Sequence, residues 1–151
     1  MTTVNFKRPE LTDRDIIDSY FKKYPSRSCD RTFANVYLWA RFYEVEFAQY
    51  NNVLLFRDNS AGYGYAFPAG EDEDVKAAIE DILEWEKEKG VPFCLYGVTK
   101  ENFAKLETWF PGKFDITYHR DEADYVYESE KLATLSGKKL HSKRNHVNKF
   151  K

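Results

Sequence analysis

The chain has 151 residues, of which 42% are hydrophobic and 17% aromatic, enough for one folded domain with its own core and too many for a disordered chain. No stretch reaches the roughly 18 apolar residues of a membrane-spanning helix, and the N-terminus lacks the apolar segment of a signal peptide, so we expect a soluble cytoplasmic protein. The net charge of −2 conceals an acidic body and a strongly basic C-terminus.

The first predicted element is a helix over residues 11–25, LTDRDIIDSYFKKYP. Thr12 followed by Asp15 has the spacing of a capping box at its start. Apolar residues then recur at helical spacing on one face: Ile16, Ile17, Tyr20 and Phe21.

A short aromatic helix is predicted within residues 28–43, with Ser28 or Asp30 as its N-cap. Residues 44–58 predict a β-hairpin, because apolar and polar residues alternate before an Asn-Asn pair at positions 51 and 52. Asparagine tolerates the positive φ that a tight hairpin turn requires.

The middle of the chain alternates strands and helices. A third strand is predicted at residues 62–67, GYGYAF, followed by a strongly amphipathic helix at 71–89 that Gly90 terminates. Residues 91–98, VPFCLYGV, are then predicted to form a buried strand.

The last predicted elements of the body are a helix over residues 99–112 capped by Thr99, and two strands, FDITYH at 114–119 and DYVYE at 124–128. This order of elements predicts an α/β (α+β) domain. Its central mixed sheet, antiparallel at the start, would be flanked by helices, and the chain would end in a basic helix.

A phosphate-binding loop is disfavoured between residues 62 and 70, although three glycines there precede a helix. The first turn of that helix, residues 71–74, is entirely acidic and would repel a phosphate. The glycines also match neither the dinucleotide fingerprint nor the P-loop.

Metal and nucleophile sites are equally disfavoured. His141 and His146 are five positions apart and diverge by about 140° on a helix, so we predict no metal site. There is no G-x-S-x-G motif. Cys29 and Cys94 form no CxxC pair and lie in apolar or aromatic contexts, so we expect two buried, inert thiols.

The strongest functional signal is the basic tail, residues 137–151, GKKLHSKRNHVNKFK. It holds 6 of the 23 Lys and Arg residues and none of the 25 Asp and Glu, which leaves 17 basic and 25 acidic side chains elsewhere. As a helix it would pack Leu140, Val147 and Phe150 onto the domain and turn a polar face outward. Eight residues are predicted to bind an anionic substrate: Lys138, Lys139, His141, Lys143, Arg144, Asn145, His146 and Asn148.

A solvated helix that merely offsets the acidic body is the alternative interpretation of the tail, and for basic runs in general it is the safer one. Two features favour a binding surface instead. No acidic residue occurs over fifteen positions, and Asn and His are mixed with the cations where a solvated helix usually alternates Glu with Lys.

Three stretches in order along the chain resemble one family: SCDRTFANVYLW at 28–39, FCLYGVTKENFAKLE at 93–107, and the whole of residues 124–151. They are similar to uncharacterised bacterial proteins related to the C-terminal domain of phosphatidylglycerol lysyltransferases. The last stretch is the most specific of the three.

The resemblance implies a tandem of two GNAT-like domains, in which relatives pass an aminoacyl group from aminoacyl-tRNA to an amine or hydroxyl acceptor. Members are usually about twice this long, so we expect residues 1–136 to be the N-terminal GNAT-like domain. Residues 137–151 would be a junction helix leading toward a second GNAT-like domain. The coenzyme A loop of GNAT enzymes, Q/R-x-x-G-x-G/A, does not occur, so we expect no cofactor and no catalysis by this half alone.

Three functions are thus open. The leading hypothesis is the substrate-facing half of an aminoacyl- or acyltransferase, with the tail on an anionic substrate such as aminoacyl-tRNA. The second is a non-enzymatic module that binds RNA or anionic lipid through the tail, in the cytoplasm or at the membrane surface. The third is a structural domain whose tail docks a second domain.

Overall fold

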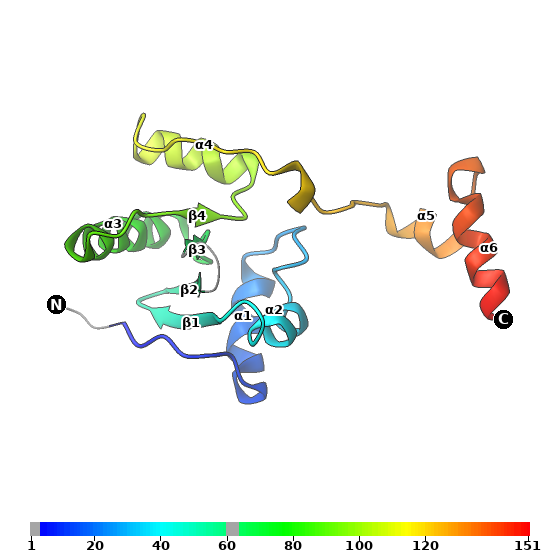
Figure 1. Ribbon diagram of the computed structural model, residues 1–151, viewed down its shortest axis with the longest axis horizontal. Coiled ribbons are helices and arrows are strands. Elements are labelled where there is room, and N and C mark those ends of the chain that lie inside the picture. The colour runs from blue at the N-terminus through cyan, green and yellow to red at the C-terminus, as the bar shows by residue number, and fades with distance from the viewer. Residues whose placement is uncertain (1–3, 60–63) are drawn as a thin grey trace. The chain divides into compact units, whose positions relative to one another are not determined.

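The computed structural model describes residues 4–59 and 64–151, so the first two residues of the predicted strand at 62–67 lie outside the described residues. The chain divides into two compact units, residues 1–118 and 119–151. The first contains a mixed sheet of four strands with helices around it, and the second contains short helices (Figure 1). The predicted fold class is therefore confirmed.

The N-terminal helix begins differently from the prediction. A 3-10 turn, η1 (Leu11–Asp13), precedes α1 (Arg14–Lys23), and Thr12 lies inside the turn, so the predicted capping box is wrong. The capping box is formed by Glu10 and Asp13 instead: the backbone N–H of Glu10, the N-cap, donates to Asp13 Oδ2 at 2.9 Å, and Lys7 Nζ lies 2.6 Å from Asp13 Oδ1. The two oxygens of the carboxylate at position 13 thus serve the backbone N–H of Glu10 and the charged ammonium of Lys7.

The cap of α2 (Phe33–Trp39) was also misplaced. Thr32 Oγ1 accepts from the backbone N–H of Asn35 at 3.3 Å, so neither Ser28 nor Asp30 is the N-cap. Asp30 lies in the loop before the helix, and its carboxylate accepts a hydrogen bond from the side-chain amide of Asn35 at 2.8 Å.

The predicted hairpin is confirmed. β1 (Val45–Tyr50) and β2 (Val53–Asp58) pair antiparallel, with Tyr50 opposite Val53. Asn51, in the turn, has φ of 49°. The turn therefore lies at the Asn-Asn pair, as predicted, and the two strands on either side of it pair in register.

The sheet continues with β3 (Gly64–Ala66), antiparallel to β2, and β4 (Leu95–Tyr96), parallel to β3. The strand predicted over 91–98 is shortened to two half-buried residues. β4 is an edge strand, and only its pairing with β3 defines it.

Between the parallel strands runs α3 (Asp72–Lys89), which ends at Gly90 with φ of 69°, as predicted. After β4 comes α4 (Lys100–Trp109), where Thr99 Oγ1 accepts from the backbone N–H of Asn102 at 3.2 Å and confirms the predicted cap.

β2 explains how the first unit is layered, because it is buried on both faces. Val53 and Leu55 belong to a cluster with α3 and α4, whereas Leu54 and Phe56 pack with α1 and α2. Since successive side chains of a strand point to opposite faces, helices cover both sides of the sheet (Figure 1).

The second unit holds η2 (Arg120–Glu122), α5 (Ser129–Thr134), η3 (Lys138–Leu140) and α6 (His141–Phe150). The strands predicted at 114–119 and 124–128 are wrong: both stretches lack regular structure. A strand needs a neighbour for its backbone groups, and no strand of the described chain pairs with either stretch.

Both cysteines are exposed, contrary to the prediction of buried thiols. Cys29 lies in the loop before α2, and Cys94 lies just before the edge strand β4. Apolar neighbours in sequence did not bury them, because neither residue belongs to the inner part of an element. None of the described helices combines the length and apolarity needed to cross a membrane.

Candidate anion-binding surface

The basic tail lies in the second unit and begins at a sharp turn. After α5, Leu135 takes the left-handed conformation with φ of 50°, and Gly137 has φ of 87° and ψ of 166°. The latter is a region that essentially only glycine occupies, which explains the glycine at the head of the tail. η3 and α6 then continue the chain as nearly uninterrupted helix.

Arg144 holds this turn closed. Its Nη1 donates to the carbonyl oxygen of Gly137 at 2.9 Å and also to that of Leu135. Its Nη2 lies 3.4 Å from His141 Nδ1, and His141 Nε2 lies 3.4 Å from Asn145 Nδ2. The half-buried guanidinium is therefore mainly an internal brace, although its remaining N–H groups can still face a ligand.

A shallow depression of about 450 Å³ opens beside this brace. Gly137, Lys138, His141 and Arg144 line it, so three of the eight predicted binding residues surround one hollow. A hollow rimmed by a lysine, an imidazole and a guanidinium suits a small anionic group such as a phosphate.

The remaining predicted residues are spread over the exposed surface of the tail rather than gathered in the depression: Lys139, Lys143, Asn145, His146 and Asn148. Exposed lysines spaced along a helix together with hydrogen-bonding side chains suit an extended polyanion better than one small ligand.

Carboxylates of the second unit do not neutralise the tail through direct contacts. Among the described residues of that unit, no ion pair joins any of the six tail cations to an acidic side chain. The acidic start of α3 is instead paired within the first unit, where Lys23 lies 3.2 Å from Glu71 and Lys105 lies 2.6 Å from Asp72.

The apolar side of the tail differs from the prediction. Leu140 is buried, but Val147 and Phe150 are 43% and 94% exposed, so within the second unit only Leu140 packs as expected. The second unit is too short to form a core that could cover a whole helix face. Cations and two uncovered apolar side chains therefore share the surface of α6.

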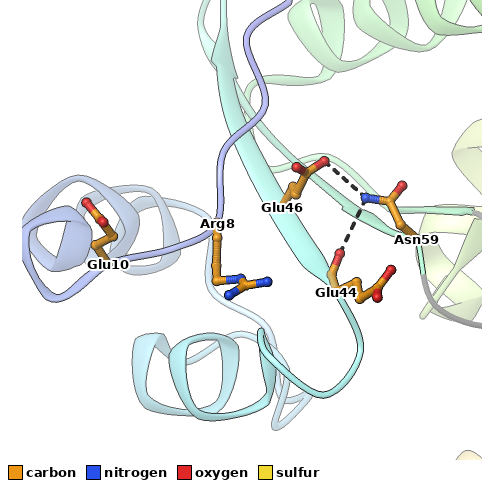
Figure 2. Close-up of a pocket in the computed structure, with 5 residues that line it drawn as sticks. All are labelled: Arg8, Glu10, Glu44, Glu46 and Asn59. Atoms are coloured by element: carbon orange, nitrogen blue, oxygen red, sulfur yellow. Dashed lines mark hydrogen bonds between the residues drawn. The ribbon is translucent and has the colours of Figure 1, made fainter.

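A second polar pocket, of about 410 Å³, lies in the first unit (Figure 2) and was missed by the sequence reasoning. It is lined by Arg8, Glu10, Glu44, Glu46 and Asn59. The sequence did contain a signal for it, because Glu46 and Arg57 face each other across the predicted hairpin.

Glu46 is the fixed centre of that pocket. Arg57 donates to its Oε2 from Nε at 2.7 Å, and Asn59 donates to the same oxygen at 3.0 Å (Figure 2). Burial raises the pKa of Glu46, but these hydrogen bonds and the charge of Arg57 outweigh it and hold the pKa below its ordinary value. A carboxylate held ionised by internal partners braces the hairpin and is poorly suited to proton transfer at neutral pH.

Comparisons with known proteins place the chain in one family and relate it to two further bacterial proteins. A family model described as phosphatidylglycerol lysyltransferase, C-terminal, matches residues 21–151. A solved structure, that of a conserved protein of unknown function from Bacteroides thetaiotaomicron VPI-5482, is 36% identical with a TM-score of 0.87, over 98% of this chain and 50% of that chain. An uncharacterized protein of Mycoplasmoides gallisepticum is 44% identical over 43 residues, 28% of this chain and 14% of that protein. The chain thus spans half the length of the solved relative.

Proposed function

The chain belongs to the family of the phosphatidylglycerol lysyltransferase C-terminal domain, and from this membership we propose that it is the N-terminal, substrate-facing half of a GNAT-like aminoacyl- or acyltransferase. The observation that carries the proposal is the basic tail. It lies inside the matched range, and its lysines are exposed without acidic partners among the described residues of the second unit.

In this proposal the tail binds the phosphates of an aminoacyl-tRNA. Lys138, Lys139 and Lys143 supply the electrostatic attraction, because exposed lysines can each neutralise a phosphate. His146 and Asn148 add directional hydrogen bonds to sugar or base. Arg144 keeps the turn before the helix closed and so fixes where Lys138 points.

Catalysis would need a second half. The first turn of α3 carries Asp72, Glu73 and Asp74, and this acidic turn does not fit the pyrophosphate of coenzyme A. We therefore propose no cofactor for this half and no transfer by it alone. The double length of the Bacteroides relative supports a second GNAT-like domain following a junction helix at 137–151.

A non-enzymatic module is the second candidate, and the uncovered apolar residues of α6 favour one version of it. Val147 and Phe150 are exposed on the same helix as the cations. Apolar side chains among lysines are typical of a helix that lies on an anionic membrane.

A salt titration of labelled tRNA binding tests the proposal. The triple variant Lys138→Gln, Lys139→Gln, Lys143→Gln should weaken binding and reduce the slope of log K against log salt by about 2 to 3, at roughly 0.7 to 0.9 per phosphate contact. The matched control is Lys22→Gln, Lys87→Gln, Lys100→Gln, which removes the same charge from exposed positions of the first unit. It should leave the slope nearly unchanged.

The outcomes separate the candidates. Equal losses in both triple variants would mean that only net charge matters and would refute the assigned surface. Binding to phosphatidylglycerol vesicles but not to tRNA would favour the membrane module. Binding to neither would leave the tail as a docking helix and refute both.

A further inference from the structure

Two exposed stretches of the chain have the composition of β-strands without being strands. Residues 115–118, DITY, and residues 124–127, DYVY, carry several large apolar side chains that solvent reaches. Their exposed fractions are 66% for Ile116, 80% for Tyr118, 85% for Tyr125, 66% for Val126 and 45% for Tyr127. Isolated exposed hydrophobic residues are ordinary, but a run of them marks an interaction surface.

Within each unit, the backbone of residues 115–118 and 125–127 is unpaired. Among the described residues, no backbone hydrogen bond joins residues 115–118 to a strand of the first unit, and none joins residues 125–127 to another residue of the second unit. The flanking residues Ala123 and Glu128 have extended backbone angles, so the chain is extended on both sides of the second stretch. Unpaired extended backbone is a template for pairing with the edge of another sheet.

The side chains also have the right periodicity. In an extended chain Ile116 and Tyr118 point to one face, and Tyr125 and Tyr127 likewise share a face. Tyrosine, isoleucine and valine are among the residues most enriched in strands. The composition of these stretches therefore favours strands, although neither stretch forms a strand in the described chain.

We propose that residues 115–118 and 124–127 become strands by pairing with the sheet of a second folded half, which corresponds to the part of the Bacteroides relative that this chain does not match. The relative matches 98% of this chain at 36% identity, and the match covers only 50% of the relative. The other half of the relative is long enough to contain a sheet. The inference rests on the second domain in the proposed function and adds one segment of each unit through which that domain would pair.

A chimera tests the pairing: the 151 residues replace the matching half of the Bacteroides relative, so that the unmatched half follows them. Hydrogen–deuterium exchange of peptides covering 115–118 and 124–127 should be at least about 100-fold slower in the chimera than in the 151-residue chain, as for amides in a stable sheet. Equal exchange rates in the two proteins would overturn the proposal.

Paired variants separate strand pairing from apolar contact. Ile116→Pro with Val126→Pro removes two N–H donors, whereas Ile116→Thr with Val126→Thr keeps the donors and the β-branched shape. The proline pair should abolish the protection in the chimera and lower its Tm, and the threonine pair should retain most of it. Both pairs should leave the Tm of the 151-residue chain unchanged, since these side chains are exposed there. Equal effects of the two pairs on the chimera would refute strand pairing.

Co-expression of the two halves tests the proposal if the chimera does not fold. The 151-residue chain and the tagged unmatched half should co-purify, and failure to do so would overturn the proposal. A dimer of the 151-residue chain that the proline pair dissolves would identify a second copy as the occupant and would overturn it too. The tRNA titration involves none of these residues, so failed pairing and a failed proposed function are distinguished.

Discussion

Replacing Arg144 with alanine should open the turn that anchors the basic helix. The side chain donates to the carbonyl oxygens of Leu135 and Gly137, and hydrogen bonds from a charged group contribute about 1.5–3 kcal/mol each when buried. Because Arg144 is only half-buried, solvent screening reduces the pair to about 2 kcal/mol in total. These contacts also hold Leu135 in a left-handed conformation that costs roughly 1–2 kcal/mol.

Such a loss is measurable as local opening. At about 1.4 kcal/mol per tenfold change, 2 kcal/mol corresponds to roughly 30-fold faster exchange of the amides in residues 135–141. A ten-residue helix is marginal in isolation, so α6 should exchange faster as well. The measurement is hydrogen–deuterium exchange with mass spectrometry, with peptides of α3 as an internal reference for the first unit.

Lys143→Ala is the matched control. It removes the same charge from the neighbouring position, but Lys143 is exposed and makes no hydrogen bond or ion pair in the described structure. It should leave exchange at 135–141 unchanged within about twofold, because surface substitutions alter stability by less than roughly 0.5 kcal/mol. Equal acceleration in both variants would show that Arg144 acts only through its charge and would refute its role as a brace.

Two further predictions concern the first unit. Burial raises the pKa of the Asp13 carboxyl, but the hydrogen bond and charge of Lys7 and the backbone N–H of Glu10 outweigh it and hold the pKa below its ordinary value. The stabilisation is therefore present above the unfolded pKa of about 4 and lost as the pH falls through the folded pKa, so Asp13→Asn should lower the Tm more at pH 7 than in acid. Since Cys29 and Cys94 are both exposed, iodoacetamide should label two thiols per native chain, as counted by intact-mass spectrometry. Labelling that requires denaturant would contradict the structure.

Much of the fold could be predicted from local signals that the tertiary structure leaves intact. The apolar spacing of 71–89 and the glycine after it gave α3 and its end, since one face of that helix packs on the sheet. The Asn-Asn pair gave the hairpin turn because its geometry demands a residue that tolerates positive φ.

The wrong predictions are those that depend on a distant partner. Several Ser, Thr and Asp residues precede α1 and α2, and which of them becomes the cap is decided by contacts such as that of Lys7 with Asp13. The same holds for the strands predicted at 114–119 and 124–128. Their composition favours a strand, but a strand also needs a neighbouring strand to pair with, which composition does not provide. Burial of the cysteines failed likewise, because it depends on how far each strand or helix extends.

The composition of the tail predicted the candidate site, but it did not predict which of its cations face solvent and which bind the chain itself. The run of cations marks the surface, but the sequence does not reveal that Arg144 turns back to the chain while Lys138 and Lys143 stay exposed. That division depends on the conformations of Leu135 and Gly137, which bring two carbonyl oxygens within reach of one guanidinium.

The two proposals use different chemistry, so ionic strength separates them. Lys138, Lys139 and Lys143 act through charge, and their contribution to tRNA binding must fall steeply as salt rises. The stretches at 115–118 and 124–127 act through backbone hydrogen bonds and apolar burial, which moderate salt hardly weakens and sulfate strengthens. A chimera whose exchange protection persists at high salt while its tRNA affinity collapses would therefore show two independent surfaces. If protection and affinity instead fell together, the cations themselves would hold the second half, and the tail would be a docking helix.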